Sequence, residues 1–70
     1  MKKLNKKEMV IGNNIMDRFE WLYSTSPEIF KEYSCMGKLG RYIEWLNRQW
    51  EMGLINREEL IIAIQLDPQF

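Results

Sequence analysis

The stretch KLGRYIEWLNRQWEM, residues 38–52, is the part of the sequence that decides the fold. Its apolar residues recur at spacings of three and four, which places them on one stripe of a helix with 3.6 residues per turn. We therefore expect a long amphipathic helix over residues 38–52. Its core-facing stripe should consist of Leu39, Tyr42, Ile43, Leu46 and Trp50.

Glycines mark both ends of this helix. Gly37 precedes it and accepts the positive φ that closes a helix, so an earlier helix should stop there. Gly53 followed by Leu54 is typical of a left-handed C-terminal cap with its hydrophobic follow-on residue. The central helix is therefore expected to lie between two turns.

Two further helices are predicted before Gly37. Residues 6–23 carry an apolar stripe at helical spacing. Two motifs then indicate the start of another helix. Ser26 before Pro27 is typical of an N-cap with proline at N1. Thr25 with Glu28 is typical of a capping box. We expect a short second helix over residues 27–34. The stripe of the first helix consists of Ile11, Ile15, Phe19 and Leu22.

A fourth helix is predicted at the end of the chain. Asn56, with Glu59 three residues later, favours a helix start, and Asp67-Pro68 should end it. The sequence thus predicts an all-α fold, a compact four-helix bundle with one short helix. Residues 8–70 should form the single helical domain, preceded by a basic N-terminal arm over residues 1–7.

The charge pattern limits the classes of partner. The formal net charge is zero. Four lysines fall in the first seven residues, so acidic residues outnumber basic ones from residue 8 onward. Such a domain lacks the broad positive field that phosphate neutralisation needs, which makes nucleic-acid binding unlikely as the main role. The longest apolar run, residues 60–64, is far shorter than a membrane span, so we expect no membrane association.

The residue types needed for chemistry are largely missing. The chain has no histidine, the side chain whose unperturbed pKa lies nearest neutrality. Its one cysteine, Cys35, cannot form an internal disulfide, and without histidine it can neither be activated in the usual way nor build a zinc site. We therefore expect no enzyme activity, no metal and no cofactor. A single cysteine without a secretory signal also favours the cytoplasm.

Two tryptophans and the last helix indicate surplus apolar surface. Trp21 and Trp45 both fall outside the apolar stripes of their helices, so they either enlarge the core by covering the short second helix or are exposed interface anchors. Ile62 and Leu66 point away from the other apolar residues of the last helix, which suggests a second neighbour. The predicted partner-binding residues, for a protein partner or a homodimer, are Trp21, Trp45, Ile62 and Leu66.

A helix-turn-helix with Gly37 in its turn is the nucleic-acid alternative. Glu44 and Glu51 would then face phosphates, which is electrostatically unfavourable. The candidate contacts for this alternative are Lys2, Lys3, Lys6, Lys7, Lys38, Arg41 and Arg48.

A family resemblance covers residues 21–49. Its matching features are Trp21-Leu22, Pro27, Ile29-Phe30, Gly37-Lys38-Leu39, Tyr42-Ile43, Leu46 and Gln49. In these features the chain resembles the conserved middle of the TnpV family, small proteins of unassigned function encoded in transposons and other mobile elements of Firmicutes. The resemblance implies a mobile-element or phage setting and supplies no catalytic residues. In that setting we expect an inhibitor of a host or defence protein, comparable with anti-CRISPR proteins. A small DNA-binding regulator and a structural homodimer are the alternatives.

Overall fold

The fold is built from helices. The computed structural model describes residues 4–66, and there the elements follow in the order α1 (Lys6–Thr25), η1 (Pro27–Met36), α2 (Gly37–Glu51) and α3 (Arg57–Gln65). Three of these are α-helices and η1 is a 3₁₀-helix. The predicted all-α class is confirmed. The four-helix bundle is not, because only three α-helices occur in the described part of the chain.

α1 begins with a capping box formed by Asn5 and Glu8. The Asn5 side chain accepts a hydrogen bond from the Glu8 backbone N–H at 2.8 Å, and the Glu8 carboxylate accepts one from the Asn5 N–H at 3.1 Å. Lys6 and Lys7, which the sequence analysis includes in the basic arm over residues 1–7, therefore belong to the first turn of α1. The other two lysines of that arm lie outside the described residues: Lys2 and Lys3.

η1 begins where Ser26-Pro27 predicts a start, but with a different cap. Ser26 is the N-cap residue and makes no side-chain capping bond. The Thr25 hydroxyl donates to the Trp21 carbonyl oxygen at 2.8 Å, so it extends the hydrogen bonding of α1 and does not form the predicted capping box with Glu28. The short second helix thus exists, but in 3₁₀ geometry.

The two predicted glycine turns on either side of α2 are both present. Gly37 and Gly53 have φ angles of 74° and 75°, a region that suits glycine because it has no Cβ. After α2, the Gly53 N–H donates to the Trp50 carbonyl at 3.0 Å, and the Leu54 N–H donates to the Gln49 carbonyl at 2.9 Å. These two bonds form a Schellman motif, which ends α2 and reverses the chain.

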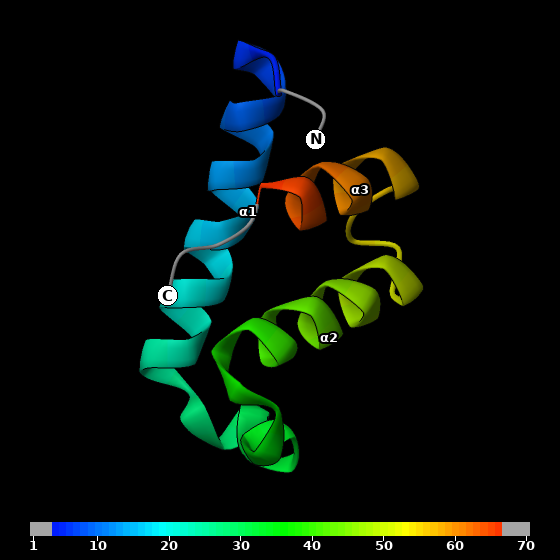
Figure 1. The fold of residues 1–70 in the computed structure, drawn as a ribbon. Coiled ribbons are helices and arrows are strands. Elements are labelled where there is room, and N and C mark those ends of the chain that lie inside the picture. The colour runs from blue at the N-terminus through cyan, green and yellow to red at the C-terminus, as the bar shows by residue number, and fades with distance from the viewer. Residues whose placement is uncertain (1–3, 67–70) are drawn as a thin grey trace.

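α3 returns alongside α2 and then contacts α1 (Figure 1). Asn56 and Glu59 form the predicted capping box, with bonds of 2.8 and 3.1 Å. At the other end of α3, Leu66 lies so close to Gly12 of α1 that a Cβ added at Gly12 would be 2.9 Å from the Leu66 Cδ2 atom. α2 and α3 therefore form an antiparallel hairpin whose second helix is anchored on the middle of α1.

Aromatic rings fill the centre of the molecule. The Phe19 ring on α1 lies 5.3 Å from that of Phe30 on η1, and 5.0 and 5.5 Å from those of Tyr42 and Trp45 on α2. Edge-to-face contacts at these distances are favourable for aromatic pairs. α1 presents its predicted stripe to this core, with Ile15 and Phe19 fully buried.

α2 is rotated relative to the expected orientation. Tyr42 and Leu46 of the predicted stripe are buried, as is Trp45, which we had placed off the stripe. The remaining three residues of that stripe stay between 36% and 48% exposed: Leu39, Ile43 and Trp50. The core therefore takes one flank of a broad apolar arc and leaves the other flank uncovered.

Candidate functional site

The four predicted partner-binding residues fall into different environments. Trp21 is 67% exposed on α1, as an interface anchor should be, whereas Trp45 is only 6% exposed and belongs to the core. Ile62 is also buried and Leu66 is partly buried against Gly12. The prediction of Trp45 and Ile62 as exposed anchors is therefore wrong, because both side chains are buried within one chain.

Trp45 nevertheless reaches the surface at the base of an apolar groove. The groove lies between the end of α1, η1 and the C-terminal half of α2, and its volume is about 180 Å³. Two side chains at its edge are strongly exposed, Ile29 at 53% and Met52 at 68%. We call this the apolar groove, lined by Leu22, Ile29, Phe30, Tyr33, Trp45, Arg48, Gln49 and Met52.

An exposed ion pair borders the apolar groove. The Arg48 guanidinium lies 2.9 Å from the Glu32 carboxylate, and it stacks over the Tyr33 ring at 5.1 Å from the centroid. Burial raises the pKa of the Tyr33 hydroxyl above its usual value. The groove thus combines an apolar interior with one positive and one negative group at its edge, which is the usual distribution in protein-binding sites.

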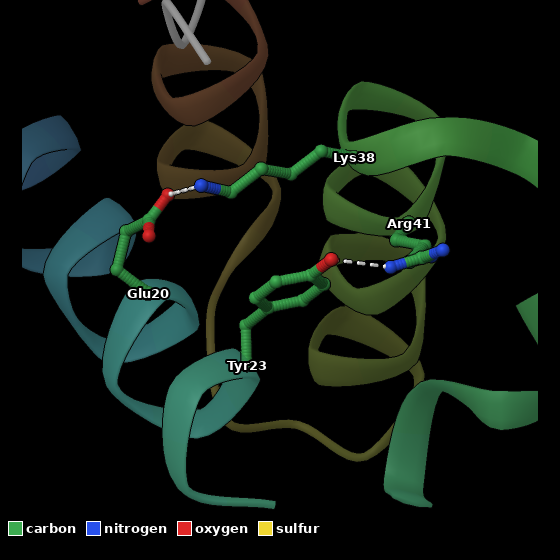
Figure 2. Close-up of polar contacts among 4 residues, drawn as sticks. All are labelled: Glu20, Tyr23, Lys38 and Arg41. Atoms are coloured by element: carbon green, nitrogen blue, oxygen red, sulfur yellow. Dashed lines mark hydrogen bonds and ion pairs between the residues drawn. The ribbon is translucent and has the colours of Figure 1, made fainter. Parts of the chain in front are cut away.

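Two of the cations proposed for DNA binding, Lys38 and Arg41, are engaged within the chain (Figure 2). The Lys38 ammonium lies 3.0 Å from the Glu20 carboxylate of α1. The Arg41 guanidinium donates to the Tyr23 hydroxyl at 2.6 Å and to the carbonyl oxygens of Tyr33 and Ser34 at 3.2 Å each. These bonds fasten α2 to α1 and to the end of η1.

That arrangement weakens the helix-turn-helix alternative. Phosphate binding would require Lys38 and Arg41 to give up contacts that hold the fold together, and Arg48 to leave Glu32. Lys6 and Lys7 lie in the first turn of α1, far along the chain from these residues. The described residues therefore provide no cluster of available cations on α2.

A second depression lies on the other side of η1. Its volume is about 280 Å³, and its lining is more polar than that of the apolar groove: of its two cationic side chains, Lys31 and Arg41, the second is already bonded to backbone carbonyls. It therefore offers less for recognition than the apolar groove. Its lining residues are Pro27, Glu28, Phe30, Lys31, Ser34 and Arg41.

Two further features of residues 4–66 concern metal ions and membranes. Within that range no group of three or more His, Cys, Asp or Glu side chains is placed to hold a metal ion. No helix there has the length and apolar character needed to cross a membrane.

No protein-family model, curated protein or solved structure matches this chain. Its most distinctive part is the apolar groove, together with the exposed Trp21 beside the groove residue Leu22.

Proposed function

We propose that this chain is a non-catalytic protein-interaction module that binds its partner through the apolar groove. The groove geometry carries the proposal: Trp45 forms an apolar base while Ile29 and Met52 stay exposed at the edge. Exposed apolar side chains around a preformed pocket are the usual features of a protein-binding hot spot. The absence of histidine from the sequence supports a role without catalysis.

The groove fits one large apolar side chain of a partner. A cavity of roughly 150 Å³ holds a benzene molecule, and the groove measures about 180 Å³. A partner that inserts a Leu, Phe or Trp side chain between Ile29 and Met52 would bury these edges and contact Trp45. Arg48 and Glu32 could then bond to polar groups of the partner around that anchor.

The setting of this interaction is a second part of the proposal. The resemblance of residues 21–49 to the TnpV family supports a mobile-element or phage origin. In such a setting a helical domain without histidine would act by blocking a host or defence protein, in the manner of an anti-CRISPR protein. The single cysteine, Cys35, is an exposed free thiol and supports a reducing compartment such as the cytoplasm.

Partner capture from a bacterial lysate tests the groove. Wild-type protein and the variants Ile29→Lys and Met52→Lys would be immobilised, and retained proteins quantified by mass spectrometry. A lysine placed in the groove leaves a charge buried against apolar surface, so each variant should retain at least about tenfold less of the partner.

The matched control is Ile61→Lys, which makes the same change at an exposed isoleucine of α3 outside the groove. This variant should capture the partner as wild type does. A partner that is retained equally by all the variants, with helicity intact by circular dichroism, would contradict the groove as its binding site.

A further inference from the structure

A second apolar surface lies on the α2–α3 hairpin. On α2, Leu39 and Ile43 are each two residues from Arg41, and Trp50 is two residues from Arg48. Two residues correspond to a rotation of 200° around a helix, which is 160° by the shorter way. The three apolar side chains therefore lie roughly 160° from the flank on which these arginines contact η1. The apolar groove lies on that same η1 flank. The two apolar surfaces of α2 therefore face in nearly opposite directions.

α3 adds two isoleucines on the same side of the hairpin. Ile64 is two residues from Leu66, which contacts Gly12 of α1, and Ile61 is one helical turn before Ile64. Both isoleucines therefore lie on the side of α3 that is turned away from α1. Because α2 and α3 are neighbouring antiparallel helices, we treat this side of α3 and the uncovered flank of α2 as one surface. We call this surface the hairpin face, formed by Leu39, Ile43, Trp50, Ile61 and Ile64.

The hairpin face is large and carries little charge. Its five side chains are 36–48% exposed. A Trp side chain presents roughly 150–250 Å² when fully exposed and a Leu or Ile side chain less, so the five leave on the order of 300 Å² of apolar surface per chain. Two side chains of opposite charge border this arc of α3, Arg57 four residues before Ile61 and Glu58 three residues before it. A surface of this kind cannot select a strongly charged partner.

We propose that the hairpin face pairs with the same face of a second copy of this chain. Stable interfaces bury about 800 Å² per partner, of which about 65% is apolar in homodimers. The apolar surface available on the hairpin face is more than half of that apolar share of about 520 Å². A two-fold axis supplies an equally long and equally apolar surface by symmetry. Two α2–α3 hairpins would then form a layer of four helices, and the apolar groove of each copy would stay open.

Measurement of the molar mass in solution tests this pairing. The chain mass is 8.5 kDa. Sedimentation equilibrium from about 1 μM to about 1 mM, the range expected for an interface of this size, should show conversion to twice that mass. Ile61→Lys and Trp50→Lys should each raise the dissociation constant at least about tenfold, because each places two like charges across the two-fold axis.

Ile29→Lys is the matched control, since it introduces the same charge on the opposite flank of the molecule and should leave dimerisation unchanged. Circular dichroism shows whether each variant is folded. If Ile61→Lys or Trp50→Lys loses helicity, Ile43→Lys is measured in its place. A wild-type mass of one chain at 1 mM, or an equal loss of dimer in Ile29→Lys, would overturn the pairing. Because partner capture depends on the groove variants and dimer mass on the hairpin variants, the two proposals fail separately.

Discussion

At the scale of single residues, Tyr42 is the polar group most deeply enclosed by the core. Its side chain is fully buried, and this burial raises the pKa of its hydroxyl to about 12, because a phenolate inside the core would lose its hydration. Below pH 10 the residue is neutral in both the folded and the unfolded chain, and its packing contributes fully. Above pH 10 the unfolded chain ionises first, which favours unfolding.

We therefore expect the free energy of unfolding to fall as the pH rises from 10 towards 12, by up to about 2–3 kcal/mol for this group. Urea denaturation at several pH values in this range measures the fall. Tyr42→Phe retains the ring packing and removes the ionisation, so its stability should depend less on pH over the same interval. Some dependence of stability on pH should remain in Tyr42→Phe, because the pKa of Tyr33 is also raised. Identical slopes for Tyr42→Phe and wild type would contradict this account.

At the scale of the elements, the ends of the helices depend on short polar motifs. Asn56 caps α3 through a reciprocal pair of bonds with Glu59. Asn56→Ala should lower the free energy of unfolding by about 1 kcal/mol, because the N–H groups at the start of α3 lose their acceptor. Thermal or urea unfolding followed by circular dichroism measures the difference.

Asn13→Ala is the matched control within α1. Asn13 is exposed in the interior of that helix, where alanine has the higher helix propensity, so the same replacement should stabilise the chain slightly. The two substitutions should thus change the free energy of unfolding in opposite directions. Equal effects would mean that the capping bonds contribute nothing beyond helix propensity.

These same motifs explain which parts of the fold could be predicted. Capping residues and glycine turns act through local bonds, so Gly37, Gly53 and Asn56 gave correct boundaries from the sequence. The predicted capping box of Thr25 was wrong, because its hydroxyl donates to a carbonyl oxygen in α1, and a pattern of residue types does not reveal this competing acceptor. The 3₁₀ geometry of η1 was missed for a related reason, since its residues also suit an α-helix.

The buried side of α2 could not be predicted from periodicity. Apolar residues cover a broad arc of this helix, from Trp45 to Ile43, so several rotations bury a comparable area. The bonds of Lys38 to Glu20 and of Arg41 to Tyr23 select one of them. They turn Trp45 inward and leave Ile43 exposed. Such contacts between distant segments are a property of the tertiary structure.

At the scale of the whole molecule, the chain has more large apolar side chains than it can bury. The sequence indicates this surplus correctly, since a domain of this length buries only about 60% of the surface of its unfolded chain. The location of the surplus was only partly predictable. Trp21 is exposed as an anchor should be, but the last helix exposes Ile61 and Ile64, and the expected Ile62 is buried. The groove edges Ile29 and Met52 had no signal in the periodic pattern.

The two off-stripe tryptophans should therefore differ in their effects on the molecule. Trp45→Ala removes a ring from the core and should lower the free energy of unfolding by about 3–5 kcal/mol. That is a large part of the total for a chain of this size, at roughly 0.05–0.15 kcal/mol per residue. Trp21→Ala removes a mostly exposed ring and should change stability by no more than about 0.5 kcal/mol. Urea unfolding followed by circular dichroism measures both.

Trp21→Ala should instead weaken partner capture by more than about fivefold, a loss of about 1 kcal/mol, because Trp21 is exposed, is next in sequence to the groove residue Leu22, and exposed tryptophans are frequent interface anchors. Lysate capture with the stable Trp21→Ala variant measures this directly. If Trp21→Ala lowered the free energy of unfolding as much as Trp45→Ala does, both rings would belong to the core. Unchanged capture by a fully folded Trp21→Ala would restrict the binding surface to the groove, because the surplus apolar surface at Trp21 would then have no role in recognition.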